Sequence, residues 1–338
     1  MSGVELTGMA YWLPLVFAFL MALSMLVYVV MDGFDLGVGA LIAGADDAEK
    51  DTMIASIGPF WDANETWLVL GVGILLVAFP TAHGVILTSL YLPVALMLCG
   101  LILRGVAFDF RVKVRASRKP LWNRIFWVGS VSASLAQGYM LGLYITGFEN
   151  GFREHLFAGF IALCLLAGYA LLGGSWLIMK TEGALQRKSI IWSRWALLLT
   201  LLGVAAVSLA TPLVSERIFE RWFSGTAMLM LAPVPLLTGL LFFACHRSLA
   251  RLNLRSGDRE WVPFACAVGI FVVSFAGLGY SLFPYLVVDR ITAWDAASAP
   301  ESLLIILFGT LFTLPAIIGY TIFSYRVFWG KATSLSYE

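Results

Sequence analysis

Nine apolar stretches constrain this chain more than any other feature of its sequence. About 20 consecutive apolar residues cross the hydrocarbon core of a bilayer, and a bilayer admits helices because each satisfies its own backbone hydrogen bonds. Windows of this kind run over 9–31, 54–79, 84–104, 124–147, 156–178, 193–213, 226–245, 262–283 and 303–325. Only 13% of the residues are charged, about half the share in soluble domains. The sequence therefore predicts an all-α integral membrane protein.

We expect one polytopic membrane domain over residues 1–338, in which two four-helix bundles and one extra helix account for nine spans. The loops fix its orientation, since 18 of the 22 Lys and Arg residues fall on one side of these spans. By the positive-inside rule that side is cytoplasmic. The C-terminus is then cytoplasmic and the N-terminus periplasmic, as an odd number of spans requires.

Acidic residues interrupt the first three apolar windows near their predicted cytoplasmic ends. Asp32 and Asp35 end the first window, Asp62 and Glu65 lie two to three turns inside the second, and Asp109 follows the third. A carboxylate at membrane depth costs roughly 2.5–3.5 kcal/mol on insertion scales, so such residues usually have a function. Carboxylates that step inward from the cytoplasm suit proton uptake toward a buried site.

Each acid also has a purely structural interpretation. Asp32 could pair with Arg104 or cap a helix end, while Asp35 and Asp109 could be ordinary ion-pair partners near the interface. Gly33 and Gly37, four residues apart in an apolar run, indicate a close helix contact rather than a phosphate loop. Both interpretations of the acids remain open from the sequence.

The sequence offers little for metal, haem or nucleic-acid binding. His83, His155 and His246 lie at window ends or in loops, so we expect this chain to bind no haem through its own side chains. Its four cysteines lack CxxC spacing and indicate small buried hydrophobes rather than a metal site. No basic run is long enough to indicate nucleic-acid binding.

Several motifs together resemble subunit II of cytochrome bd-type quinol oxidases. They are DGFDLGVG at 32–39, WDANETW at 61–67, AFP at 78–80, RGVAFDFR at 104–111, FPY at 283–285 and WDAAS at 294–298. Their order and the nine-window layout also fit that family, and the chain length is closest to its cyanide-insensitive branch.

The resemblance implies an enzyme subunit in a prokaryotic cytoplasmic membrane. In that family a haem-bearing subunit I holds two b-type haems and one d-type haem, oxidises quinol and reduces dioxygen to water. Subunit II packs against it, supports haem assembly and supplies a cytoplasmic proton route. The resemblance also allows a bound quinone, membrane lipid and small single-span subunits as partners.

The resemblance also implies roles for particular residues. Asp35 and Asp62 would carry protons, and Trp67 and Asn64 would lie at the subunit interface where oxygen reaches the haem. The residues expected to support the proton path are Asp32, Asn64, Glu65 and Asp109.

A second function class is a proton-coupled secondary transporter that works alone, with Asp62 and Glu65 as its coupling site. Transporters usually show internal repeats with broken helices at matching positions. Here the acids crowd into the first three windows and no repeat is visible. The pattern therefore favours the oxidase subunit.

Overall fold

The computed structural model describes residues 8–214, 216–252 and 259–332, nearly all of them helical. The elements, in chain order, are α1 (Met9–Leu41), the 3-10 helix η1 (Ile42–Gly44), α2 (Asp47–Ile57), α3 (Trp61–Ala78), α4 (Pro80–Ser89), α5 (Tyr91–Lys113), the 3-10 helix η2 (Ala116–Arg118), α6 (Lys119–Ile145), α7 (Phe152–Lys180), α8 (Gly183–Val214), α9 (Glu216–Phe223), α10 (Gly225–Leu231), α11 (Pro233–Leu252), α12 (Val262–Leu282), β1 (Tyr285–Val287), β2 (Ile291–Thr292), α13 (Ala293–Ala296) and α14 (Pro300–Val327).

Eight helices among the described residues are long and apolar enough to cross a membrane, namely α1, α3, α5, α7, α8, α11, α12 and α14. This confirms the predicted class, an all-α integral membrane protein. The predicted window 124–147 falls in α6, which has 27 residues but buries the polar side chains of Ser130, Ser134 and Gln137. The total of nine spans and their orientation remain predictions.

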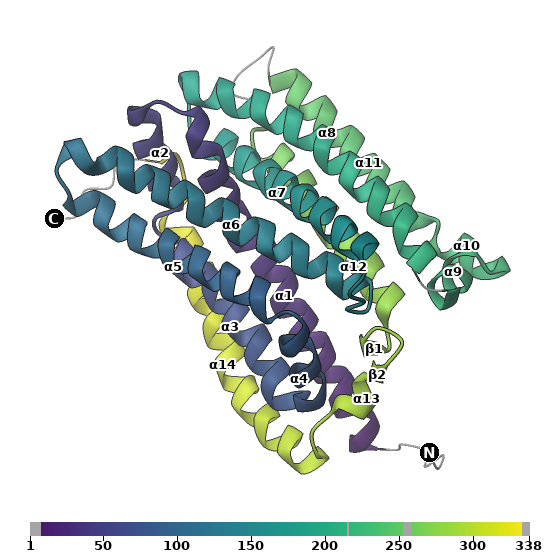
Figure 1. Ribbon diagram of the computed structural model, residues 1–338. Helices are drawn as coiled ribbons and strands as arrows, with labels where there is room; N and C mark the ends of the chain where they lie inside the picture. The colour runs from purple at the N-terminus through teal and green to yellow at the C-terminus, as the bar shows by residue number, and fades with distance from the viewer. Residues whose placement is uncertain (1–7, 215, 253–258, 333–338) are drawn as a thin grey trace.

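Helix α1 lies at the centre of the packing (Figure 1). It contacts α3 on one side and both α6 and α7 on the other, while α5 packs along α6 and α8 along α7. Helices α11 and α12 pair with each other and reach α8 and α7, respectively. These packing pairs do not test the predicted division into two four-helix bundles, which stays a prediction.

Glycines allow α1 and α7 to approach unusually closely. A Cβ added at Gly37 would lie 1.7 Å from the carbonyl oxygen of Tyr169, and one added at Gly173 would lie 2.3 Å from the backbone nitrogen of Val38. Small residues at such positions let helix backbones approach within membranes. The close helix contact that the glycine spacing predicts is confirmed.

Two predicted spans are wrong at the ends that carry the acids. The window 54–79 is divided between α2 and α3, because Gly58 and Pro59 interrupt the helix. Asp62 therefore lies in the first turn of α3 rather than two to three turns inside a span. The window predicted to end at residue 104 continues as α5 to Lys113, which places Arg104 within the helix.

A short hairpin and α13 lie at the end of the bundle opposite to α2 (Figure 1). Strands β1 and β2 pair antiparallel, with Tyr285 opposite Thr292. Thr292 and Asp295 then form a capping box that starts α13. An ion pair of 2.6 Å between Arg217 Nε and Asp289 Oδ1 ties α9 to this hairpin.

Candidate functional site

Three helices bring an arginine and two acids together in a largely buried cluster. Arg104 Nη2 of α5 lies 2.6 Å from Asp32 Oδ1 of α1 and also contacts Glu65 Oε1 of α3. The side chains of Asp32 and Arg104 are 0% and 1% exposed, whereas Glu65 keeps 26% of its side chain exposed. Removing an ion from water costs several kcal/mol, which the opposite charge and its hydrogen bonds offset here. The Asp32–Arg104 pair expected as one alternative is present.

The third acid, Asp35, has a neutral partner. Asn64 of α3 donates from Nδ2 to Asp35 Oδ2 at 2.8 Å and to the backbone oxygen of Met31 at 3.3 Å. Tyr325 of α14 donates from its hydroxyl to Asn64 Oδ1 at 3.2 Å. Asp35 and Asn64 are both 0% exposed. Hydrogen bonds therefore link Tyr325 of α14, Asn64 of α3 and Asp35 of α1, and no basic side chain takes part in this chain of bonds.

A second polar chain continues from this cluster toward the middle of α1. Tyr28 lies one turn before Asp32, so both occupy the same stripe of the helix. Gln137 of α6 donates from Nε2 to the Tyr28 hydroxyl at 2.8 Å, and the Tyr169 hydroxyl of α7 donates to Gln137 Oε1 at 2.6 Å. All three side chains are buried. Sequence reasoning missed them, although a glutamine inside an apolar window was an available signal.

Two predicted site residues lie outside the buried cluster. Asp62 is exposed in the first turn of α3, one turn before Glu65, and Asp109 is exposed on α5. The structure therefore does not bring Asp109 together with the other acids. Asp62 lies at the surface of the chain, because it is on the face of α3 opposite to the one that packs on α1.

Trp67 lies on the face of α3 that is turned into the chain. Its side chain is 4% exposed in the chain alone, and its expected place at a subunit interface stays a prediction. It belongs to the inward face of α3, whose buried residues are Asn64, Trp67, Gly71, Ile74 and Ala78. That spacing of three and four residues is the period of one helical face, and this face packs against α1.

The charges of the cluster are unbalanced. Asp32, Asp35 and Glu65 supply three carboxyl groups, whereas Arg104 supplies one cation. Within the described residues, Asp32 Oδ2 and Asp35 Oδ1 are buried without a protein hydrogen-bond partner. A buried polar atom without a partner costs free energy, and an ionisable side chain inside a membrane span is a candidate for a functional site.

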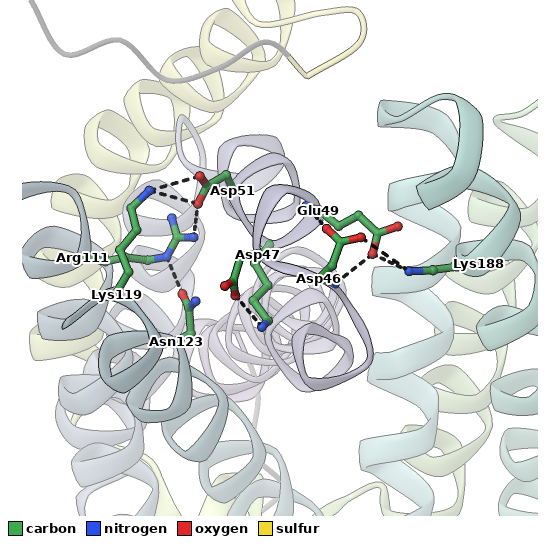
Figure 2. Close-up of polar contacts among 9 residues, drawn as sticks. Asp46, Asp47, Glu49, Asp51, Arg111, Lys119, Asn123 and Lys188 are labelled. Carbon is green, nitrogen blue, oxygen red and sulfur yellow. Dashed lines mark hydrogen bonds and ion pairs between the residues drawn. The ribbon is translucent and has the colours of Figure 1, made fainter. Parts of the chain in front are cut away.

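Helix α2 lies at one end of the bundle (Figure 1), and Figure 2 shows the polar contacts that attach it there. On one side Asp51 contacts Arg111 Nη2 and lies 3.1 Å from Lys119 Nζ, while Arg111 Nε donates to Asn123 Oδ1 at 2.5 Å. Partial burial raises the pKa of the Asp51 carboxyl, but hydrogen bonds from Lys119 and Arg111 outweigh this effect and hold the pKa below its usual value. These contacts tie α2 to α5 and α6.

The other side of α2 is fastened to α8 and α7. Lys188 Nζ of α8 lies 2.6 Å from Glu49 Oε2 (Figure 2), and the indole nitrogen of Trp176 donates to the backbone oxygen of Ser56 at 3.2 Å. The buried residues of α2 run from Met53 to Ile57 and join the main hydrophobic core. Helix α2 is therefore held on both sides, by α5 and α6 and by α7 and α8.

Among the described residues, no group of three His, Cys, Asp or Glu side chains could hold a metal ion. Both ring nitrogens of His155 are occupied, one by the Tyr139 hydroxyl at 2.6 Å and one by Asn150 Oδ1 at 2.6 Å. His246 is exposed on the outside of α11. These side chains do not fit the axial ligation that a haem iron needs.

Comparisons with known proteins agree on one family. A family model described as cytochrome bd terminal oxidase subunit II matches residues 13–328. The cytochrome bd-I ubiquinol oxidase subunit 2 of Escherichia coli (strain K12) is 26% identical, covering 100% of this chain and 98% of that protein. The cytochrome bd ubiquinol oxidase subunit 2 of Bacillus subtilis (strain 168) is also 26% identical, covering 91% of this chain and 94% of that protein.

The fold has a counterpart among solved structures. A chain of the bd oxidase from Geobacillus thermodenitrificans superimposes with a TM-score of 0.77, covering 94% of this chain and 99% of that chain. The two sequences are 15% identical, so this likeness shows the fold alone.

Proposed function

The chain belongs to the cytochrome bd terminal oxidase subunit II family, and from this premise we propose that it supplies protons to a quinol oxidase complex that reduces dioxygen to water. It is a multi-pass protein of the bacterial inner membrane. Its curated relatives are second subunits of ubiquinol oxidases, and those complexes contain haem. We assign the haems and the quinol site to subunit I, in line with the family resemblance; the described residues of this chain hold no group of three metal-ligating side chains.

The partner contact is proposed for the outward face of α3. Asp62 and Thr66 are exposed there in the first two turns, and Val69 follows with 72% of its surface exposed. Exposed polar groups at the start of a span are costly against lipid. A subunit packed on this face would cover Thr66 and Val69 and leave Asp62, in the first turn, open to the cytoplasm. The buried Arg104 cluster behind α3 would keep the face rigid. Support for haem assembly would then be indirect, through a firm docking surface.

The proton route is proposed to run from the surface of α3 into the cluster. Asp62 would receive protons at the entrance, Glu65 lies one turn further along α3, and Asp32 and Asp35 hold the buried positions. The single observation that carries this proposal is the 0% exposed Asp35, whose Oδ2 accepts from Asn64 at 2.8 Å. An ionisable side chain buried within a membrane span is costly to the stability of the fold, so proton transfer is a better account of Asp35 than stabilisation.

The transporter alternative has less support. Glu65, one half of its coupling site, is held by Arg104 in a three-helix ion-pair cluster, which suits a fixed path better than a site that opens alternately to both sides. Family membership also favours an oxidase subunit.

The proposal is tested by quinol-driven oxygen consumption of the purified complex that carries Asp35→Asn. Asparagine keeps the size and polarity of the side chain but cannot release a proton. We expect intact haem spectra together with turnover reduced by at least about tenfold, a bound set below the roughly 10²–10⁴-fold contribution of general acid–base catalysis. Asp47→Asn is the matched control, because Asp47 is 77% exposed on α2 and lies outside the cluster. Normal turnover with intact haem in Asp35→Asn would remove Asp35 from the route.

A further inference from the structure

Two adjoining cavities meet at Lys180, where α7 ends beside the end of α14. The smaller, about 140 Å³, is mainly apolar, with Trp176, Met179, Tyr325 and Trp329 in its wall. The larger, about 290 Å³, is bordered by more polar side chains from α2 and from the α7–α8 connection, including Thr52 and Thr181. Lys180 and Lys331 line both cavities. Each volume well exceeds the roughly 10–15 Å³ that a single water molecule needs on the same measure.

Lys180 is a buried cation with an incomplete set of partners. Its side chain is 6% exposed, and its ammonium donates to the backbone oxygen of Phe328 at 3.0 Å. It also lies 4.9 Å from the ring centre of Trp176 and 5.5 Å from that of Phe60. Among the described residues no carboxylate lies within ion-pair distance of it. An ammonium has three donors, so two remain for an anion.

The other charges around the cavities are largely paired within the protein. Lys331 Nζ lies 2.5 Å from Glu260 Oε2, and Glu49 Oε2 lies 2.6 Å from Lys188 Nζ. Glu182 stands on the rim as an exposed carboxylate. Among the described lining residues, Lys180 is therefore the buried charge for which no ion pair is formed, and the ligand that matches it carries a negative charge.

The position favours a ligand that is part lipid and part anion. Helices α7 and α14 are both long and apolar enough to cross the membrane, and both end here, on the side that the loop charges assign to the cytoplasm. Trp329 is 79% exposed beside the smaller cavity, as is typical of an indole at the membrane interface. An apolar cavity and a polar one that share a buried lysine match the junction between acyl chain and headgroup.

We propose that this pair of cavities binds the headgroup of an anionic phospholipid from the cytoplasmic leaflet. The phosphate lies against Lys180 and Lys331 in the larger cavity. The glycerol and the first acyl carbons lie against Trp176 and Trp329 in the smaller one. The bound lipid joins α2, α7 and α14, whose residues line the cavities.

The test uses the purified, delipidated complex in detergent and follows its thermal midpoint as phosphatidylglycerol is added in mixed micelles. We expect phosphatidylglycerol to raise the midpoint and phosphatidylcholine to have little effect. In Lys180→Met the half-saturating lipid fraction should rise by about tenfold or more, the equivalent of one charge-assisted hydrogen bond. Lys113→Met is the matched control, because Lys113 is exposed on α5 at the same end but away from the cavities; it should respond like the wild type.

Two further arms keep the test decisive. Inorganic phosphate alone should not raise the thermal midpoint as phosphatidylglycerol does. An equal rise with phosphate would show that the site binds a free anion and would overturn the proposal. Should Lys180→Met fail to assemble, Trp329→Ala decides instead, because this exposed indole can be removed without opening the core. A reduced phosphatidylglycerol response in Trp329→Ala supports the site, and wild-type responses in every variant that assembles would overturn it.

Discussion

Replacing Arg104 by methionine should destabilise the complex strongly. Methionine keeps much of the side-chain volume but leaves Asp32, which is 0% exposed, without its countercharge, and also releases Glu65. Removing one partner of a buried ion pair typically costs about 3–5 kcal/mol. At about 2 °C per kcal/mol this corresponds to a fall of roughly 6–10 °C in the apparent Tm of the purified complex. Differential scanning fluorimetry at one heating rate measures it.

The double variant Asp32→Asn with Arg104→Met separates the lost pair from general damage. Neutral groups of similar volume often replace a buried pair at little cost, so the double variant should recover several degrees relative to Arg104→Met. The remaining acid, Glu65, is 26% exposed and can stay in contact with water. A double variant whose loss equals the sum of the two single losses would refute the reasoning, because independent sites behave additively.

Two other changes test the packing and the fastening of α2. Gly37→Ala should prevent assembly, because the added Cβ would lie 1.7 Å from the Tyr169 carbonyl oxygen. Gly73→Ala is the control: its Cβ would have no atom within 4 Å, so the yield of complex should be unchanged or higher. Size-exclusion chromatography with haem detection measures both yields. Asp51→Asn should lower Tm by an amount equivalent to less than about 1 kcal/mol at pH values above ~4. The reason is that the folded protein lowers the pKa of the Asp51 carboxyl. The ionised carboxylate therefore stabilises the fold fully above the pKa of the unfolded chain, and this stabilisation is lost as the pH falls through the pKa of the folded protein. A Tm difference that persists unchanged in the most acidic buffer would contradict this origin.

The membrane class was predictable because hydropathy is a local property of the chain. Long apolar windows specify helices wherever they lie, and eight of the described helices meet that criterion. The predicted end of the third window was wrong for a non-local reason. Arg104 resembles the end of a span in sequence, yet it lies inside α5 because carboxylates from α1 and α3 compensate its charge. Only the tertiary contacts reveal that compensation.

The candidate site was predictable in part. The acids of α1 and α3 do meet, and their shared helical faces were visible in the sequence. The depth of Asp62 was misjudged although Gly58 and Pro59, which separate α2 from α3, were an available signal. Trp67 shows what the spacing of apolar residues leaves undecided. A helical period reveals which residues share a face, but not whether that face meets α1, lipid or another subunit.

Proton uptake in a single turnover tests the central claim most directly. The fully reduced complex is mixed with oxygen, a pH-sensitive dye follows proton uptake, and the haem spectrum follows electron transfer. The account predicts that Asp35→Asn slows proton uptake by at least about tenfold while the first electron-transfer step keeps its rate. Proton uptake at the wild-type rate in a variant with intact haem would contradict a route through the cluster of Asp32, Asp35, Glu65 and Arg104.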